Sequence, residues 1–336
     1  MATKIGINGF GRIGRLSLRA ILERYPDELE VVAVNDLTDV AMNAMLFKRD
    51  TVYGTFAGDV SHDEDSFQVA GHDIRVFKDP DPGSIPWSEV GAEVVLESTG
   101  FFTDGKKAAA HLGSTVKKVI ISAPAKNEDV TLVLGVNDSV YDPGSHHVIS
   151  NASCTTNGLA PVAKVLHESF GIDKGLLTTI HAYTNSQATV DTAKSKPRDS
   201  RAAAENIVPA PTGAARAVGL VIPELQGKFT GMAFRVPVAS VSVVDFTAVL
   251  LKEASVSDVN QAMQAAAAGP LAGIMEYTEE ELVSSDLKGN PHSSIFSATD
   301  TVTLGNMVKA VAWYDNEWGY SCRIADLCRF VAERGL

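Results

Sequence analysis

Cysteine is scarce in this chain of 336 residues, which contains only Cys154, Cys322 and Cys328. Three cysteines at these spacings form neither a disulfide framework nor a metal-ligand cluster, so we expect no bound metal and a reducing, cytoplasmic location. Long apolar runs are also missing, because charged residues such as Glu97 interrupt them well before the ~18 residues that a membrane span requires. The first residues enter a strand-like segment directly, without the apolar region of a signal peptide.

Basic residues are in the minority. Lys and Arg number 29 against 41 Asp and Glu, which gives a formal net charge of −12 at pH 7. Nucleic acid is therefore not an expected partner, because a phosphate backbone requires a basic surface. The remaining composition, 45% hydrophobic and 21% charged, is that of an ordinary globular protein. At roughly 150 residues per domain, the length predicts about two domains.

The first half of the chain alternates strand and helix patterns. Strands are predicted at 4–10, 30–36, 93–97 and 116–123, and helices at 12–25 and 106–112. This βαβ rhythm predicts a parallel sheet with helices on its faces.

The second half has a different rhythm. Strands are predicted at 174–183, 231–238, 241–251, 294–304 and 307–315, and helices at 155–170 and 256–268. Runs of strands with few helices indicate an α+β domain with a mostly antiparallel sheet. A last helix buries a stripe of Ile324, Leu327, Cys328 and Val331. We expect the domains to be 1–150, joined by the C-terminal helix from about 317 to 336, and 151–316.

Residues 9–14, Gly-Phe-Gly-Arg-Ile-Gly, have the pattern G-x-G-x-x-G between the first predicted strand and helix. Gly9 permits the tight turn, Gly11 lets a pyrophosphate approach the backbone, and Gly14 lets the helix pack on the strand. Asp36 ends the second predicted strand about 20 residues later, the spacing of a ribose-binding acid. The alternative is a structural turn with a strand-capping Asp36; the context favours dinucleotide binding.

Cys154 lies between an apolar stretch and an amphipathic helix, in the sequence Ser-Cys-Thr-Thr-Asn. A helix N-terminus favours thiolate over thiol, so Cys154 is a candidate nucleophile. His181 ends a predicted strand of the same domain and is the candidate base. The alternative for Cys154 is an inert buried thiol, which is the assignment given to Cys322 and Cys328. A dinucleotide site with a reactive cysteine suggests that a thiolate adds to an aldehyde, hydride passes to nicotinamide, and a thioester remains.

Eight sequence blocks carry a family resemblance. In chain order they are NGFGRIGR, VNDLTD, ESTGFF, ISAPAK, SNASCTTN, TIHAYTN, PTGAARAVG and WYDNEWGYS. Together they resemble the phosphorylating glyceraldehyde-3-phosphate dehydrogenases over nearly the whole chain, and SNASCTTN and WYDNEWGYS are highly specific. The resemblance implies an α/β Rossmann dinucleotide-binding domain and an α+β catalytic domain with a mostly antiparallel sheet.

The resemblance also implies residue roles. Cys154 is the nucleophile, His181 is the base, and the Cys154 N–H and His181 hold the oxyanion. Asn316 holds the nicotinamide carboxamide, with a helix N-cap as its structural alternative. The implied cofactor-binding residues are Gly9, Gly11, Arg12, Ile13, Gly14, Asp36, Lys78, Ser122 and Asn316. The substrate phosphate is assigned to Thr184 and Arg235, and inorganic phosphate to Ser153, Thr155, Thr212 and Gly213. For Arg235 the alternative is a solvated arginine at a strand edge.

Three positions depart from the family pattern. Gly158 stands where many relatives have a second cysteine. The segment Arg198-Asp199-Ser200-Arg201 lacks the consecutive arginines that make an accessory phosphate contact in some bacterial relatives, but other relatives also have Arg-Asp there, so this contact stays open. Thr192-Ala193 replaces the Leu-Pro or Gly-Pro of NAD-specific relatives. Because Asp36 repels a 2′-phosphate, we expect NAD to be preferred. By resemblance, the missing proline and the Thr192 hydroxyl favour a 2′-phosphate, so we expect NADP to be used less efficiently but measurably; the alternative for Thr192-Ala193 is neutral variation of a loop.

The expected activity is the reversible conversion of glyceraldehyde 3-phosphate, inorganic phosphate and NAD to 1,3-bisphosphoglycerate and NADH, in glycolysis or gluconeogenesis. Two alternatives remain: erythrose-4-phosphate dehydrogenase, against which Thr184 argues, and a non-catalytic NAD-sensing protein. Family resemblance also implies a homotetramer. The charge balance and the short apolar runs predict no nucleic-acid or membrane partner.

Overall fold

The computed structural model describes residues 2–336, which fall into two compact units. The first unit comprises the chain up to Leu132, Ser139–Ala152 and Ser321–Leu336, and the second comprises Val133–Asp138 and Ser153–Tyr320. Within these described residues, no helix combines the length and the apolar character needed to cross a membrane.

The first unit contains a nine-stranded sheet in the order β10-β11-β9-β8-β1-β2-β7-β6-β5. The pairs from β10 to β7 are parallel, and β6 and β5 add an antiparallel edge. The strands are β1 (Thr3–Asn8), β2 (Leu29–Asn35), β5 (Val60–His62), β6 (Ser66–Val69), β7 (His72–Phe77), β8 (Val94–Glu97), β9 (Lys118–Ile121), β10 (Val130–Thr131) and β11 (Val148–Ser150). The central strands are rich in Val and Ile because both faces of a parallel sheet are covered.

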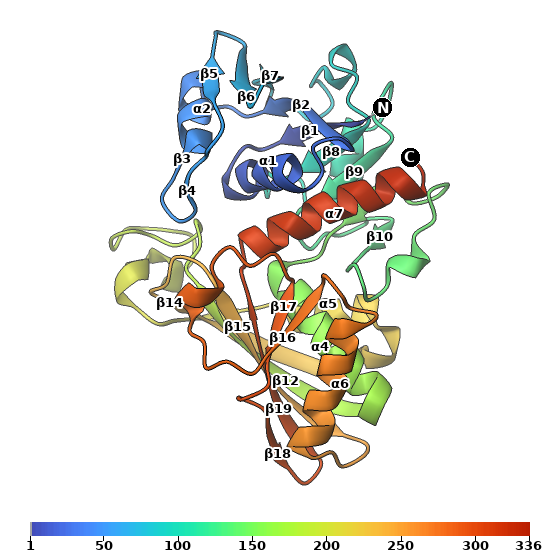
Figure 1. The fold of residues 1–336 in the computed structure, drawn as a ribbon. Coiled ribbons are helices and arrows are strands. Elements are labelled where there is room, and N and C mark those ends of the chain that lie inside the picture. Colours follow the sequence, from blue (N-terminus) through green and yellow to red (C-terminus); the bar gives the residue numbers. More distant parts are fainter. Residues whose placement is uncertain (1) are drawn as a thin grey trace. The chain divides into compact units, whose positions relative to one another are not determined.

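Helices α1 (Arg12–Arg24), α2 (Val40–Lys48) and α3 (Gly105–Ala108) connect these strands, and a short ribbon joins β3 (Arg49–Asp50) to β4 (Gly54–Thr55). The last helix, α7 (Trp318–Arg334), lies beside α1 in Figure 1. Arg24 and Tyr25 both donate to the Asp326 carboxylate, which ties the two helices together. The predicted apolar stripe of α7 is confirmed, since Ile324, Leu327, Cys328 and Val331 are fully buried.

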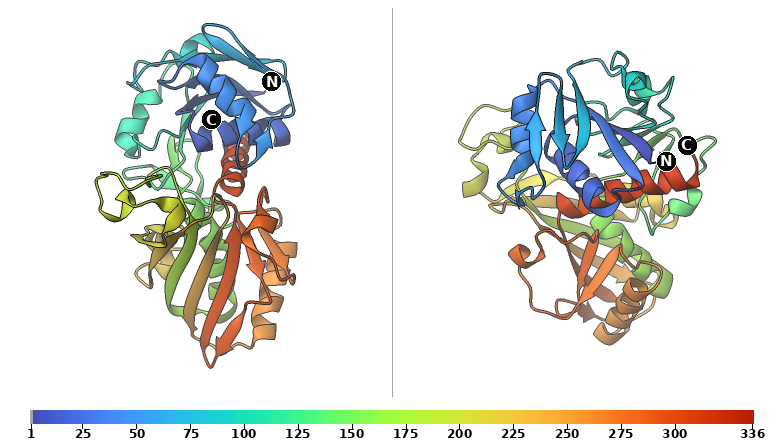
Figure 2. Two further views of the ribbon diagram at one scale, coloured as in Figure 1. Left: turned by 90° about the vertical axis from the view of Figure 1, so that its left-hand side faces the viewer. Right: turned by 45° about the horizontal axis from the view of Figure 1, so that its top comes forward.

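The second unit contains a sheet in the order β13-β14-β12-β15-β19-β17-β16, with β18 paired to β19. Its pairs are antiparallel except for β12 with β14 and β16 with β17. The strands are β12 (Ile172–Ala182), β13 (Val208–Pro211), β14 (Phe229–Val236), β15 (Ser242–Leu250), β16 (Met275–Thr278), β17 (Ser294–Ser297), β18 (Val302–Leu304) and β19 (Met307–Tyr314). The left view of Figure 2 shows the long strands of this sheet side by side.

Helices α4 (Cys154–Phe170), α5 (Ala214–Val221) and α6 (Val256–Ala268) pack together on one face of this sheet (Figure 1). The predicted fold class is confirmed: a parallel Rossmann-type sheet in one unit and a mixed, mostly antiparallel sheet in the other. One predicted strand is wrong. Residues 294–304 form two short strands, β17 and β18, because residues 298–301 turn out of the sheet.

Candidate functional site

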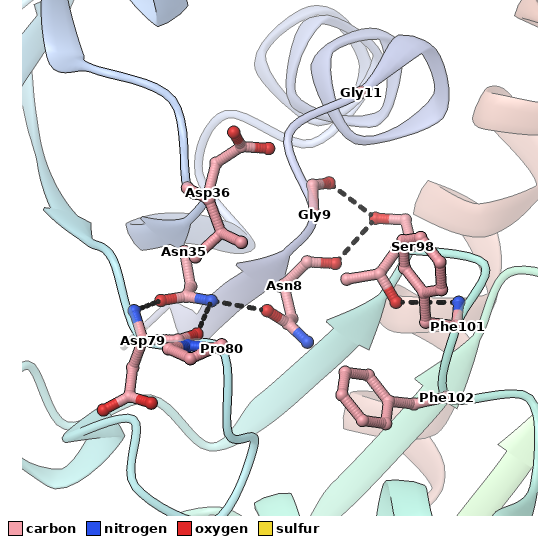
Figure 3. Close-up of a pocket in the computed structure, with 12 residues that line it drawn as sticks. Asn8, Gly9, Gly11, Asn35, Asp36, Asp79, Pro80, Ser98, Phe101 and Phe102 are labelled. Carbon is pink, nitrogen blue, oxygen red and sulfur yellow. Dashed lines mark hydrogen bonds between the residues drawn. The ribbon is translucent and has the colours of Figure 1, made fainter. Parts of the chain in front are cut away.

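The first unit has a pocket of about 530 Å³ beside the carboxyl ends of β1, β2 and β8 (Figure 3). Its lining residues are Asn8, Gly9, Gly11, Asn35, Asp36, Leu37, Asp79, Pro80, Ser98, Thr99, Phe101 and Phe102. Ligands of open parallel sheets bind outside the carboxyl ends of the strands. This pocket is therefore the candidate dinucleotide site.

The three glycines of the turn meet different steric demands, and each fits the role predicted for it. Gly9 has a φ of +89°, and a Cβ there would lie 2.6 Å from the Thr99 nitrogen. A Cβ on Gly14 would lie 2.2 Å from the Gly9 oxygen, so a side chain would push α1 away from β1. A Cβ on Gly11 would meet no atom within 4 Å. That open position, at the start of α1, lets a diphosphate approach the backbone. The turn therefore fits a dinucleotide.

Asp36 lies at the pocket with its carboxylate held in place. One carboxylate oxygen accepts from the Phe10 N–H at 2.8 Å, and the other accepts from the Thr38 N–H at 2.9 Å. Asp36 therefore connects the glycine turn to the end of β2, and it lines the pocket where a ribose-binding acid is expected.

The other predicted cofactor residues are less tightly grouped. Arg12 and Ile13 form the first turn of α1, and the Arg12 side chain forms an ion pair with Asp50. Lys78, which is exposed, and Ser122 do not line the pocket, so their contribution stays a prediction.

The pocket also uses an amide pair that the sequence did not indicate. Asn35 Nδ2 donates to Asn8 Oδ1 at 2.8 Å, and Asn35 Oδ1 accepts from the Asp79 N–H at 2.9 Å (Figure 3). Both asparagines are last in their strands, and β1 and β2 are neighbours. The sequence offered a partial signal, a polar residue at the end of each strand, but it did not show that these two strands are neighbours.

In the second unit, Cys154 is the first residue of α4. The Ser153 hydroxyl caps this helix by accepting from the Thr156 N–H at 3.0 Å. Cys154 Sγ lies 3.6 Å from His181 Nε2, at the end of β12. His181 Nδ1 donates to the Ala182 carbonyl at 2.7 Å, which leaves Nε2 as the nitrogen that faces the sulfur. The structure thus brings the two predicted catalytic residues together.

Both groups are electrically neutral in this arrangement. Burial, with help from the Arg235 charge, lowers the pKa of His181 to about 3, so its imidazole is unprotonated near pH 7. Burial raises the pKa of the Cys154 thiol, although Arg235 and the Thr155 hydroxyl act to lower it. The expectation from the helix N-terminus alone has the opposite direction. The difference arises because desolvation penalises the thiolate.

Arg235 neighbours this pair because β14 runs parallel to β12 and places Arg235 in register with His181. Its guanidinium approaches the Ala182 carbonyl at 3.5 Å. Arg235 also lines a pocket of about 370 Å³ with Ser186, Lys196, Pro197, Arg198, Asp199, Pro209, Ala210 and Pro211. This pocket has three basic side chains and one acidic one, which suits an anion.

The remaining predicted phosphate residues lie in turns and at helix starts. Thr184 Oγ1 lies 3.1 Å from Ser186 Oγ, which connects it to the Arg235 pocket. Thr212 Oγ1 accepts from the Ala214 N–H at 3.2 Å, and Gly213 is the N-cap of α5 with open space where a Cβ would be. Backbone N–H groups at helix starts are anion-binding groups.

Tyr314, which the sequence did not single out, is buried behind the Cys154–His181 pair. Its hydroxyl lies 2.8 Å from both Thr155 Oγ1 and Thr179 Oγ1, and its ring meets the His181 ring edge-on at 6.0 Å between centroids. A Cβ at Gly158 would lie 3.1 Å from the Tyr314 ring. The Thr155 hydroxyl, which is predicted to bind phosphate, therefore already contacts the Tyr314 hydroxyl.

Asn316 lies between β19 and α7 and is buried. The alternative role predicted for Asn316, capping a helix, is performed by Asp315. The Oδ1 atom of Asp315 accepts from the Glu317 and Trp318 N–H groups. The Asn316 side chain instead accepts from Ser242.

The other thiols differ from Cys154. Cys322 and Cys328 are free and fully buried, and burial raises the pKa of each to about 12. Among residues 2–336, His, Cys, Asp and Glu form no group of three or more that could hold a metal ion.

Comparisons with known proteins cover both units. Residues 3–105 match the family model "Glyceraldehyde 3-phosphate dehydrogenase, NAD binding domain", and residues 153–316 match "Glyceraldehyde 3-phosphate dehydrogenase, C-terminal domain". The chain is 56% identical to a glyceraldehyde-3-phosphate dehydrogenase of Geobacillus stearothermophilus over 100% of both chains. It is 55% identical to glyceraldehyde-3-phosphate dehydrogenase 1 of Bacillus cereus over 99% of this chain and 100% of the relative. For glyceraldehyde-3-phosphate dehydrogenase 1 of Caenorhabditis elegans the identity is 53% over 98% of both chains. The chain belongs to the glyceraldehyde-3-phosphate dehydrogenase family.

Proposed function

We propose that this protein oxidises glyceraldehyde 3-phosphate with NAD and inorganic phosphate, and that the acyl group passes through a thioester on Cys154. The observation that carries the proposal is the 3.6 Å approach of Cys154 Sγ to His181 Nε2 at the N-terminus of α4. A nucleophile within reach of an oriented base is the arrangement that covalent catalysis needs.

In the first step, Cys154 Sγ attacks the aldehyde carbon and the thiol proton passes to His181 Nε2. The neutral imidazole can accept this proton because burial keeps the pKa of His181 low. The carbonyl π electrons move to oxygen, which the Cys154 N–H and the protonated Nε2 stabilise. One such donor contributes about 3 kcal/mol to lowering a barrier. Nε2 then returns the proton to this oxygen and gives the hemithioacetal.

NAD, when bound, accepts the hydride that leaves the hemithioacetal carbon. His181 Nε2 takes the hydroxyl proton in this step, and a thioester remains on Cys154. Inorganic phosphate then attacks the thioester carbon and the C–S bond breaks. The departing sulfur recovers its proton from Nε2, the phosphate proton is lost to water, and 1,3-bisphosphoglycerate is released.

Two groups of residues bind the anions in this proposal. Thr184 and Arg235 bind the substrate phosphate, and Ser153, Thr155, Thr212 and Gly213 bind inorganic phosphate. The basic side chains around Arg235 support the first assignment. The positions of Ser153 and Thr155 at the start of α4, and of Thr212 and Gly213 at the start of α5, support the second.

NAD is assigned to residues 1–150 with the C-terminal helix, and catalysis to 151–316. The residues proposed to hold NAD are Gly9, Gly11, Arg12, Ile13, Gly14, Asp36, Lys78, Ser122 and Asn316. The shape of the glycine turn and the fixed Asp36 carboxylate support the assignment for the diphosphate and the ribose. We further propose a cytoplasmic homotetramer, on family grounds.

A burst measurement tests the proposal. Enzyme mixed with glyceraldehyde 3-phosphate and NAD without phosphate should form NADH in an amount equal to the Cys154 sites and then slow sharply. Added phosphate should restore steady turnover. Steady NADH formation without phosphate would contradict a thioester intermediate that phosphate resolves. Absence of any burst would contradict the dehydrogenase activity itself.

A further inference from the structure

Ser242, the first residue of β15, makes two hydrogen bonds from a nearly fully buried position. Its Oγ accepts from the Ala182 N–H at 3.1 Å, and its hydroxyl donates to Asn316 Oδ1 at 2.8 Å. Ala182 is also the residue whose carbonyl accepts from His181 Nδ1 at 2.7 Å. One serine therefore connects the end of the strand that carries the base to the amide assigned to nicotinamide.

The direction of these hydrogen bonds fixes the orientation of the Asn316 amide. A buried hydroxyl requires an acceptor for its proton, and of the two polar atoms of a carboxamide only the oxygen can accept. The Asn316 oxygen therefore faces Ser242 and the NH₂ group points the other way. Within residues 2–336, Nδ2 takes part in no hydrogen bond, so this donor is kept for a ligand acceptor such as a carboxamide oxygen.

The backbone conformation of Val241, the residue before Ser242, indicates that this position is constrained. Val241 has a φ of 70°, which is unusual for a β-branched residue, and its side chain is buried. Conformations of this kind persist only where the surroundings enforce them, and they cluster at functional sites. Here the unusual conformation directly precedes β15 and the Ser242 hydroxyl.

We propose that Ser242 is a positioning residue that presents the Asn316 NH₂ group to the nicotinamide carboxamide. The inference rests on the proposed role of Asn316. It predicts that Ser242 affects binding of the nicotinamide half of the cofactor and leaves the ADP-ribose half untouched.

Calorimetric titration with NAD and with ADP-ribose tests this, because the second ligand lacks nicotinamide. In Ser242→Ala the affinity for NAD should fall about 3- to 10-fold, the effect of one hydrogen bond, with the affinity for ADP-ribose unchanged. Ser242→Thr, which keeps the hydroxyl, should retain the difference between the two ligands. Ser294→Ala is the matched control: Ser294 is a fully buried serine of the same sheet whose Oγ has no partner among the described residues.

A double-mutant cycle separates the positioning role of Ser242 from the proposed role of Asn316. If Ser242 acts through Asn316, then Ser242→Ala should have no further effect on NAD affinity in the Asn316→Ala background. Equal losses for NAD and ADP-ribose in Ser242→Ala, or additive losses in the double variant, would overturn the inference about Ser242. An unchanged NAD affinity in Asn316→Ala would instead contradict the proposed role of Asn316.

Discussion

Replacing Asp36 with asparagine should relax the choice between NAD and NADP. The carboxylate is half-buried at the pocket and is held by the Phe10 and Thr38 N–H groups. Asparagine at this position keeps one acceptor oxygen for these donors but removes the charge. One of the two backbone donors loses its acceptor, so the loss that is common to both cofactors reports the disturbed turn. The change in the ratio between the cofactors reports electrostatic repulsion of a 2′-phosphate.

The size of the effect follows from Coulomb's law. Two unit charges about 4 Å apart interact by about 1 kcal/mol in water and about 4 kcal/mol at the effective dielectric constant of a partly buried site. A difference of 1.4 kcal/mol corresponds to a factor of ten. In Asp36→Asn the ratio of kcat/KM for NAD to kcat/KM for NADP should therefore decrease by a factor of about 5 to several hundred. The absolute kcat/KM for NAD should fall as well, because a ribose hydrogen bond weakens.

Steady-state kinetics with both cofactors, at low and at high salt, measure this ratio. Asp39→Asn is the matched control, since Asp39 is an exposed carboxylate three residues away that caps α2 and does not line the pocket. Its ratio should stay close to that of the parent enzyme. A ratio that is unchanged in Asp36→Asn, or changed equally in Asp39→Asn, would refute the prediction that the Asp36 charge disfavours NADP.

Four further outcomes are expected. Cys154→Ser should lose nearly all turnover while binding NAD with unchanged affinity in calorimetry, because a hydroxyl is a much poorer nucleophile than a thiol; substantial activity would contradict the assignment. Tyr314→Phe should lower the free energy of unfolding in urea by about 1–3 kcal/mol, since two buried threonine hydroxyls lose their partner. Replacing Thr192-Ala193 with Leu-Pro should depress kcat/KM for NADP and leave NAD kinetics nearly unchanged. The low pKa of His181, about 3, means that its imidazole binds a proton less readily in the folded protein than in the unfolded chain. Its contribution to stability is therefore complete above pH 6.5 and is lost as the pH falls toward 3. From pH 7 to pH 4 the parent should lose about 3 kcal/mol more than His181→Asn in urea titrations, and parallel pH profiles would contradict the neutral imidazole.

Local periodicity was enough to predict the elements with a strong pattern. The helix predicted at 256–268 coincides with α6, and the one predicted at 155–170 is α4 less its first residue, Cys154. The glycine turn could be predicted because each of its glycines has a separate steric role within one short loop. By contrast, α5 and the strands β5 and β6 at the edge of the sheet were not predicted, because short segments carry too little periodicity to distinguish helix from strand.

The parts of the site that depend on sheet order could not be predicted. Asn8 and Asn35 meet only because β1 and β2 are neighbours, and Tyr314 reaches Thr155 across 159 residues of chain. The pKa of Cys154 shows the same limitation. Its position at a helix N-terminus is local information, whereas the burial that raises its pKa is a property of the folded unit.

The glycine at position 158, one helical turn after the nucleophile, has a consequence for oxidative damage. An oxidised Cys154 would carry a sulfenic acid, which a second thiol nearby could convert to a reducible disulfide. Gly158 offers no such thiol, and Cys322 and Cys328 are buried with high pKa values, so they supply no thiolate. Recovery then depends on a thiol arriving from solution. The enzyme would stay inactive for as long as such thiols are depleted, and its activity would follow the reducing capacity of its surroundings.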